Sequence, residues 1–337
     1  MEMFDLINKI THIPSVSGNE KTALPVIKEI LSPYTDNVFC DNFGNIKAVF
    51  GKGGILLEAH IDKIGMIVTF AGENGFIKAA PIGSIDARIL PAGNVKILAE
   101  KELYGVAASV PPHLASAEDS KTAKEVTDVN IDTGLSTEEA KKLICVGDRI
   151  MYDEKTVMLS EDELCSMYLD NSIGAAVIIR TVEILKEHGS LDNLTLCFTA
   201  QEEAGLRGAG AAVYGAENEK VICVDTSFAS SPGVRPEKSG RMGAGPMIGF
   251  SPVLDSEMSC ELKKLAEEKE IPYSVEVMGA STGTNADVIS KSFSGFRTAL
   301  VSVPIRNMHT PSEICDLNDI EDSAYLIAEY IMKGEKE

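Results

Sequence analysis

The sequence predicts an α/β protein: an α/β/α domain with a mostly parallel central sheet, interrupted by a small β-rich, barrel-like domain. Near both ends of the chain, apolar strand-like runs alternate with helical patterns, which is typical of parallel sheets. Between about residues 63 and 163, short alternating segments are separated by Gly or Pro, which is typical of a small antiparallel sheet or barrel. We therefore expect one domain over residues 1–62 and 164–337, with an inserted domain over 63–163.

The first part of the chain has two helical patterns followed by strand patterns. Apolar residues recur at helical spacing in the second helix. A buried type of strand then ends in His60 and Asp62, where its apolar run stops. The expected elements are helices over 3–11 and 19–33 and strands over 36–41, 45–50 and 54–62.

The inserted segment has the period of short strands. A polar stretch over 113–133 interrupts it, and Ser136-Thr-Glu-Glu139 then supplies a capping box for a helix. Residues 146–148 and 157–159 could return the chain to the sheet. The expected strands of the insertion cover 66–71, 76–80, 95–98 and 103–107.

From residue 165 the alternation of helices and strands resumes. Apolar residues at helical spacing make 172–188 a clear helix, and residues 226–255 are expected to be rich in loops. The other expected elements are strand 194–200, a helix after Gly205, strand 220–225, helix 256–270, strands 273–278 and 298–303, and a final helix over 318–333.

Composition narrows the classes of protein. The chain has 337 residues, 44% of them hydrophobic, which is ordinary for a soluble globular protein. A net charge of −20 argues against binding nucleic acid or an anionic membrane. The seven cysteines form no CxxC pair, so neither a disulfide framework nor a zinc ribbon is indicated. Residues 1–30 lack a signal-peptide pattern, and no run of 18 apolar residues occurs, so we expect a cytoplasmic protein.

Two neighbouring carboxylates, Glu202 and Glu203, follow strand 194–200 and precede glycines that would end it. Open α/β sheets bind ligands beyond the carboxyl ends of their strands. Adjacent residues on a strand point to opposite faces, so we expect the two glutamates to serve different environments. One could bind a metal ion while the other transfers a proton. The alternative is a solvated pair that opens a helix, where negative charge suits the helix dipole.

Further residues with metal-binding side chains stand where strands meet loops. They are His60, Asp170, Asp225 and His309. With Glu203 they make two histidines and three carboxylates, a set that suits a dinuclear site of Zn²⁺, Co²⁺ or Mn²⁺. Asp62 could accept the second N–H of the His60 ring and so fix its tautomer.

With these residues the sequence resembles the co-catalytic metallopeptidases, and within them the M42 aminopeptidases. The matching segments are His60-Ile-Asp62, Leu169-Asp-Asn171, Gln201-Glu-Glu203, Val224-Asp225 and Arg306-Asn-Met-His309. The likeness runs nearly end to end, from Pro14-Ser-Val-Ser-Gly18 through Pro111-Pro-His-Leu114 to His309-Thr-Pro-Ser-Glu313. That family includes glutamyl and deblocking aminopeptidases and the tetrahedral TET particles, and members have been labelled endoglucanases.

The place of the insertion separates the related families. The separation between His60 and Asp170 leaves room for a whole domain and exceeds that between Asp225 and His309. The related M20 carboxypeptidases and deacylases resemble the reverse case, with a lid inserted late. The M28 aminopeptidases lack a large early insertion. The sequence therefore favours M42, in which the inserted segment serves as a dimerisation domain.

The resemblance implies a role for each residue of the set. Asp170 would bridge two divalent metal ions per chain, Zn²⁺ or Co²⁺ or else Mn²⁺. The remaining ligands would be His60 and Asp225 for one ion and Glu203 and His309 for the other. Glu202 would be the general base and acid, and Asp62 would orient His60. The implied activity is removal of N-terminal residues from short peptides by a homo-oligomer, either a dimer or a dodecamer built from dimers.

Three positions depart from the pattern of the family. Ser172 stands where Arg is common, Asn285 where Asp is common, and Lys63 where Glu is common. These departures motivate one alternative, a metal-poor family member that acts as a binding or scaffolding protein. A second alternative is a glycoside hydrolase, which needs two carboxylates about 5–9 Å apart on either side of a sugar. The adjacent pair Glu202 and Glu203 is poorly placed for that task.

Overall fold

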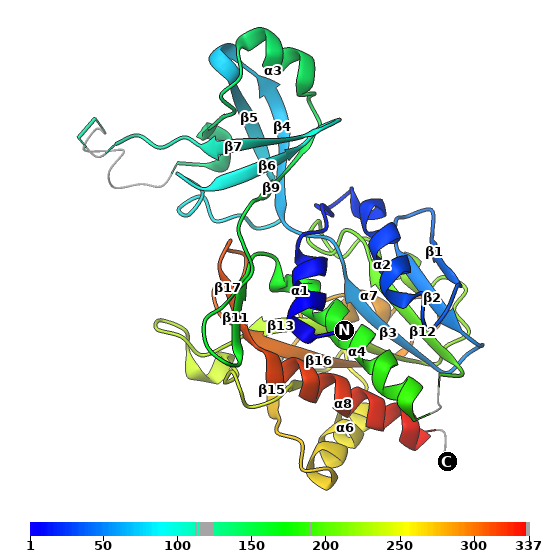
Figure 1. Cartoon of the computed structure of the whole chain (residues 1–337). Helices are drawn as coiled ribbons and strands as arrows, with labels where there is room; N and C mark the ends of the chain where they lie inside the picture. The colour runs from blue at the N-terminus through cyan, green and yellow to red at the C-terminus, as the bar shows by residue number, and fades with distance from the viewer. Residues whose placement is uncertain (112, 115–123, 189–190, 335–337) are drawn as a thin grey trace.

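The protein has two lobes, a large α/β lobe and a small β-barrel, seen below and above in Figure 1. The structure is a computed structural model that describes residues 1–111, 113–114, 124–188 and 191–334. The first helix and the last described helix both lie on the α/β lobe (Figure 1). The chain leaves this lobe after one central strand and re-enters it before a long helix, so the barrel is an insertion. The predicted fold class is confirmed.

The α/β lobe is organised on an eight-stranded sheet with the order β1-β2-β12-β3-β13-β16-β14-β15. Its four central strands β12, β3, β13 and β16 run parallel to one another. The pairs β1 with β2, β2 with β12 and β14 with β16 are antiparallel, and β14 and β15 are parallel to each other. The strands are β1 (Val38–Cys40), β2 (Ile46–Phe50), β3 (Ile55–His60), β12 (Leu194–Thr199), β13 (Lys220–Phe228), β14 (Met247–Phe250), β15 (Ser274–Val277) and β16 (Arg297–Ile305). Because the central strands are parallel, their carboxyl ends meet at one edge.

Helices cover both faces of this sheet. One face packs against a layer of helices centred on α4, which contacts α1, α8, β3 and β13. The opposite face packs against the short helices α5 and α7. The helices are α1 (Met3–Thr11), α2 (Leu24–Leu31), α4 (Leu169–Glu187), α5 (Ala209–Ala212), α6 (Ser256–Glu268), α7 (Ala286–Ile289) and α8 (Leu317–Gly334).

The central strands are buried on both faces. On β13, Ile222 and Val224 belong to the core under α4, while Val221 and Cys223 belong to the core under α5 and α7. Side chains alternate along a strand, so the two sets separate by position. Parallel strands covered on both faces are expected to read as continuous apolar runs, which is how these strands read in the sequence.

The small lobe is a closed six-stranded barrel with the order β4-β5-β8-β7-β6-β9. Pairing of β4 with β9 closes it. The strands are β4 (Gly65–Ala71), β5 (Phe76–Ile82), β6 (Asn94–Leu98), β7 (Glu102–Ala107), β8 (Asn130–Asp132) and β9 (Arg149–Tyr152). Helix α3 (Thr137–Leu143) begins after Ser136, and the predicted capping box with Glu139 is present. The four strands predicted within the insertion are confirmed.

Several predicted elements differ in the structure. Residues 157–159 join neither the barrel nor the eight-stranded sheet, because β10 (Val157–Met158) lies with β11 (Glu163–Ser166) and β17 (Glu313–Asp316) in a separate three-stranded sheet. Residues 146–148 precede β9, which belongs to the barrel. The sequence reading also missed β14 and β17, which are four residues long and carry little periodic signal. The helix expected over 19–33 begins as a 3₁₀ turn over Glu20–Ala23.

The predicted domain boundaries at 63 and 163 stay a prediction. Much of the stretch 113–133, and part of the segment 111–114, lie outside the described residues. Within the described part of the chain, no helix is both long and apolar enough to cross a membrane.

Candidate active site

The structure brings all seven predicted site residues to one edge of the α/β lobe. His60 is the last residue of β3, Asp225 lies on β13, and Asp170 lies in the first turn of α4. Glu202 and Glu203 follow β12, and His309 follows β16. The parallel strands end together, so residues far apart in the sequence become neighbours at this edge.

Asp170 lies between the two histidines. Its Oδ1 is 3.2 Å from His60 Nε2, and its Oδ2 is 3.1 Å from His309 Nε2. Each histidine also has a second carboxylate beside the same ring nitrogen. Asp225 Oδ1 is 3.7 Å from His60 Nε2, and Glu203 Oε1 is 3.2 Å from His309 Nε2. One carboxylate is thus shared by two matching arrangements of His and acid.

These residues fit two divalent ions. One group is His60, Asp170 and Asp225, and the other is Asp170, Glu203 and His309; within each, the ligand atoms lie within 4.8 Å of one another. Imidazole nitrogen and carboxylate oxygen are donors that suit Zn²⁺, Co²⁺ and Mn²⁺. The donor set therefore has the composition and the closeness that two such ions need.

The crowded carboxylates of the pocket are stabilised by positive charge. Burial, together with the charges of Asp225, Glu203 and Asp170, raises the pKa of Glu202 to about 9 despite the nearby imidazole. Burial likewise raises the pKa of Glu203 and of Asp225. Buried carboxylates that crowd together ionise only with compensating cations. The cluster is therefore favourable when protons or metal ions occupy it.

The sequence predicted that Glu202 and Glu203 point to opposite faces of a strand, and this prediction is wrong. Strand β12 ends at Thr199, and Gln201 adopts a positive φ of 55°, which turns the chain. Both glutamates then face the same pocket, with Glu202 Oε2 3.9 Å from His60 Nε2. The alternation rule fails here because the pair lies beyond the strand.

Asp62 holds the turn that carries these glutamates. Its carboxylate is fully buried and accepts the backbone N–H of Glu202 at 2.9 Å and that of Glu203 at 3.1 Å. The hydroxyl of Ser17 donates to the same carboxylate at 2.5 Å. The Nδ1 of His60 is 3.1 Å from the backbone oxygen of Asp62 but 3.6 Å from its carboxylate. The expected contact with His60 thus runs through the main chain, because β3 ends before residue 62.

Glu313 is a residue of the site that the sequence reading quoted in a motif but gave no role. Its side chain is 2% exposed and accepts the N–H of Asp170 at 3.0 Å and that of His309 at 2.6 Å. It ties the carboxylate shared by both groups to one of the two histidines. The pairing of β17 with β11 puts it there, and no local pattern announces that pairing.

The three departures from the family pattern do not line the pocket. Lys63 is buried, and its Nζ donates to the backbone oxygens of three residues at the end of α1, at 2.7 to 2.8 Å. Asn285 donates from Nδ2 to Glu58 Oε1 at 2.7 Å and to Thr199 Oγ1 at 2.8 Å. Ser172 is buried, and its hydroxyl has no hydrogen-bond partner among the described residues. Lys63 and Asn285 thus bond to the scaffold behind the site.

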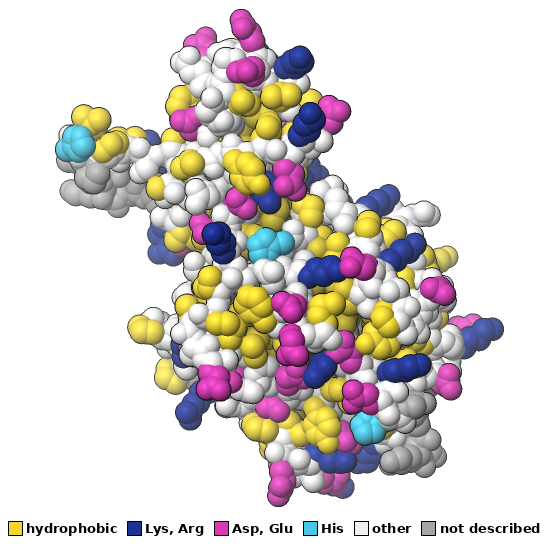
Figure 2. Space-filling view, in the orientation of Figure 1, with side chains coloured by type: hydrophobic (Ala, Val, Ile, Leu, Met, Phe, Trp, Pro, Cys, Tyr) yellow, Lys and Arg dark blue, Asp and Glu magenta, His cyan; other side chains and the backbone are white. Residues whose placement is uncertain are grey.

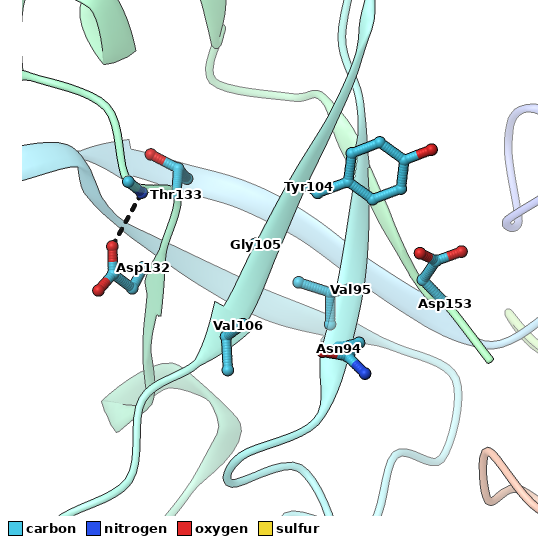
Figure 3. Close-up of a pocket in the computed structure, with 9 residues that line it drawn as sticks. Asn94, Val95, Tyr104, Gly105, Val106, Asp132, Thr133 and Asp153 are labelled. Atoms are coloured by element: carbon cyan, nitrogen blue, oxygen red, sulfur yellow. Dashed lines mark hydrogen bonds between the residues drawn. The ribbon is translucent and has the colours of Figure 1, made fainter.

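The site opens into a cavity of about 420 Å³. Besides the charged cluster, its wall includes hydroxyl and apolar side chains from β13 and from the loops before α7 and after β16. A second pocket of about 400 Å³ lies on the barrel across β6, β7 and β8. Figure 3 shows it, with Tyr104 and Asp153 toward one end and Asp132 and Thr133 toward the other. It contains none of the predicted site residues.

Solved structures share this fold over almost the whole chain. An aminopeptidase from Desulfurococcus kamchatkensis superposes with a TM-score of 0.90 and 29% identity, covering 98% of this chain and 95% of that one. The TET1 peptidase of Pyrococcus horikoshii superposes with a TM-score of 0.85 and 28% identity, covering 98% and 99%. The shared fold places the chain in the same class of protein as these α/β aminopeptidases.

The sequence comparison gives the family. The model for M42 glutamyl aminopeptidase matches residues 44–326. A lysyl aminopeptidase of Pyrococcus furiosus is 32% identical over 331 residues, covering 96% of this chain and 95% of that protein. The chain therefore belongs to the M42 aminopeptidase family, and the enzyme is an exopeptidase-type hydrolase.

Proposed function

We propose that this protein is a dinuclear metal-dependent aminopeptidase that removes N-terminal residues from short peptides. The observation that carries the proposal is the pair of donor groups that share Asp170. The family supports the use of divalent metals and the attack on peptide chains from the N-terminus. The imidazole and carboxylate donors suit either Zn²⁺ or Co²⁺, and Mn²⁺ is a further candidate.

Each donor group would hold one ion, with Asp170 in both. His60 and Asp225 would complete the first, and Glu203 and His309 the second. When bound, such ions supply Lewis acidity that polarises a peptide carbonyl and lowers the pKa of water towards about 7. Asp62 and Glu313 would keep the donors in place through the backbone N–H groups that they accept.

Glu202 would carry the proton. It lies beside the donor cluster and is absent from both donor groups, so its carboxylate is free to act on a water. Cations in the pocket lower its raised pKa, because they favour the charged form of a nearby carboxyl group. The ionised group then takes a proton from the attacking water and delivers it to the leaving amine.

The test combines metal analysis with one substitution. The protein should retain close to two divalent ions per chain after dialysis at neutral pH. Glu202→Gln should keep these ions and lose about 10²–10⁴-fold in kcat on aminoacyl chromogenic substrates. Glu237→Gln, which changes an exposed glutamate in the same way, is the matched control. Activity of Glu202→Gln equal to the wild type would contradict the mechanism, and less than one ion per chain would favour the scaffold alternative.

A glycoside hydrolase has one specific observation in its favour. A structure from Thermotoga maritima described as an endoglucanase superposes with a TM-score of 0.76 and 26% identity. The geometry of this chain disfavours that chemistry, because the carboxylates crowd around two histidines and do not face each other across a groove for a sugar. Hydrolysis of a β-glucan that survives both chelation and His60→Ala would revive this alternative.

We also propose that the barrel mediates dimerisation within a larger homo-oligomer. Its outer surface exposes large apolar side chains, with Phe70 60% and Tyr104 61% exposed, and Figure 2 shows hydrophobic side chains on the visible face of this lobe. The TET1 peptidase of Pyrococcus horikoshii is described as assembling into a tetrahedron or an octahedral shell. Tyr104→Arg should shift the mass in light scattering toward the monomer. Phe293→Arg, at an exposed aromatic residue of the α/β lobe, should not break a dimer formed by the barrel.

A further inference from the structure

The wall of the active-site cavity carries one charge besides the metal-binding cluster. The charged residue is Asp287, in the first turn of α7. The other side chains of the wall are neutral, and among the described residues no Lys or Arg lines the cavity. The wall therefore offers a negative charge to whatever enters.

Asp287 keeps this charge. Its Oδ1 accepts the N–H and the hydroxyl of Thr282, both at 2.8 Å, and its Oδ2 accepts the N–H of Gly283 at 3.1 Å and the hydroxyl of Ser281. These donors lower its pKa against the opposing effect of burial. No cationic side chain of the described residues lies within ion-pair distance of it. The donors hold the carboxylate in place at the cavity without neutralising it.

The neighbouring cations do not compensate Asp287. Arg207 follows the wall residue Leu206 but is itself exposed and outside the lining. Arg306 precedes the wall segment Met308–His309, but its guanidinium pairs with Glu163 at 3.6 Å. A second acid, Glu276, lies behind the wall and accepts the hydroxyl of Ser227 at 2.6 Å, and its pKa is raised by burial. The unbalanced charge at the wall is therefore that of Asp287.

The donor cluster leaves this charge uncompensated when it holds metal. Two divalent ions bring four positive charges, which the carboxylates of Asp170, Glu202, Glu203 and Asp225 match one for one. An acidic side chain that enters the cavity is then repelled by Asp287 and finds no cationic side chain to pair with among the described residues. A cationic side chain gains an attraction that weakens with salt.

Apolar surface beside this charge suits a long aliphatic stem. Phe228 is 53% exposed at the end of β13, and Leu206 and Met308 line the same cavity. Lys and Arg side chains bury their methylene stems on such surfaces while their charged ends stay solvated or paired. The chemistry of the wall thus matches a side chain that is apolar near its root and positive at its tip.

We propose that the enzyme prefers peptides whose N-terminal residue is lysine or arginine, and that Asp287 is the residue that sets this preference. The inference rests on the proposed function, because it assigns the side-chain pocket of that same site. The free α-amine and the scissile carbonyl would lie at the donor cluster, and the cationic side chain would extend along the apolar wall toward Asp287.

The first experiment compares substrates on the metal-loaded enzyme. The p-nitroanilides of Lys, Arg, norleucine and Glu separate charge from chain length, since norleucine has the stem of lysine without its amine. We expect kcat/KM for Lys to exceed that for norleucine by about tenfold and that for Glu by about a hundredfold, with both ratios falling as salt is added. A preference for Glu, or equal rates for Lys and norleucine, overturns the proposal while leaving the aminopeptidase assignment intact.

The second experiment changes the charge at the wall. Asp287→Asn should reduce the ratio of Lys to norleucine about tenfold and leave the norleucine rate within threefold. Two variants at Ser281 separate charge from loop structure. Ser281→Ala removes one hydrogen bond to the same carboxylate and should keep the ratio. Ser281→Lys removes the same bond but adds a cation, and should abolish the preference. An equal effect of Ala and Lys at this position overturns the role of the charge.

Binding provides a readout that needs no turnover. In Glu202→Gln, calorimetry should show L-lysine amide binding about tenfold tighter than norleucine amide, and L-glutamate amide binding weakest. Equal affinities overturn the proposal even if no anilide is cleaved. Failure of the wild-type enzyme to cleave any aminoacyl anilide, with Lys still bound most tightly, contradicts the proposed function and supports the charge preference of the pocket.

Discussion

Restoring the aspartate that is common in the family at position 285 should destabilise this protein. Asn285 is 1% exposed, and its Nδ2 donates to Glu58 Oε1 at 2.7 Å. Glu58 is itself 2% exposed and also accepts the hydroxyl of Thr199 at 2.6 Å. An aspartate at 285 would replace the donor by an acceptor and bring two buried carboxylates together. The carboxylate at 58 thus explains why an amide is favourable at 285.

The magnitude follows from two contributions. Losing a hydrogen bond to a charged group costs about 1.5–3 kcal/mol. One of the two carboxyl groups must also take up a proton, which costs about 1.4 kcal/mol for each unit by which the pH exceeds its ordinary pKa. Relaxation of the site offsets part of this sum, so we expect a loss of about 3–5 kcal/mol near neutral pH, the range measured for breaking buried charge pairs. That is a large fraction of a typical stability of 5–15 kcal/mol.

Urea unfolding of the metal-free protein measures the effect, with a double-mutant cycle as the control. Asn285→Asp should lower the unfolding midpoint strongly. The pair Glu58→Gln and Asn285→Asp restores one donor and one acceptor, so it should recover most of the loss. A single variant Asn285→Asp that is as stable as the wild type would refute the reasoning. So would a double variant no more stable than the single one, because the repulsion would then have no part in the effect.

Three further outcomes are expected. Lys63→Met should lower the free energy of unfolding in urea by about 3 kcal/mol, because three buried backbone oxygens at the end of α1 lose their donor. The metal content should not change. A variant as stable as the wild type would contradict the capping role of Lys63. Glu313→Ala should weaken metal binding about 10–100-fold, measured in competition with a chelator. Glu313→Gln keeps one acceptor, so its affinity should lie between those of the wild type and Glu313→Ala. Unchanged metal affinity in both variants would contradict the positioning role of Glu313. Burial raises the pKa of Asp319 to about 7, so the folded protein binds a proton there that the unfolded chain releases above about pH 4. Stability should therefore fall as the pH rises from about 4 to about 7 and level off above that. Asp319→Asn should remove roughly 2 kcal/mol of that decline between about pH 5 and pH 8, and an unchanged pH dependence would exclude Asp319 as its source.

Periodic and local signals carried the fold prediction. Strands β3, β12 and β13 were visible because buried parallel strands are continuous apolar runs, and the capping box at Ser136 was visible because its residues lie within one turn. The short strands β14 and β17 were missed because four residues hold too little pattern to separate strand from loop. The missed β17 is also the element that delivers Glu313.

Strand ends were the signal from which the candidate site residues were predicted. His60 and Asp225 occupy positions near the ends of apolar strands, where an α/β sheet places ligands. The separate tasks expected of Glu202 and Glu203 stay a prediction, but the reason given for them was wrong, since both side chains face one pocket from a turn. The metal-binding roles of the donors also stay predictions that metal analysis will decide.

The sequence by itself determined which residues could do chemistry and on which kinds of element they stand. Only the tertiary structure decided their partners and surroundings: it pairs Asp62 with the backbone of Glu202 and Glu203, and Glu58 with Asn285. It also brings Asp287 to the cavity wall, where it is the one charged side chain outside the metal-binding cluster among the described residues. The physical reason is that periodicity and propensity describe interactions within a few residues. These partners are far apart in the sequence, and the packing of the whole sheet and its helices brings them together. No local sequence pattern records such contacts.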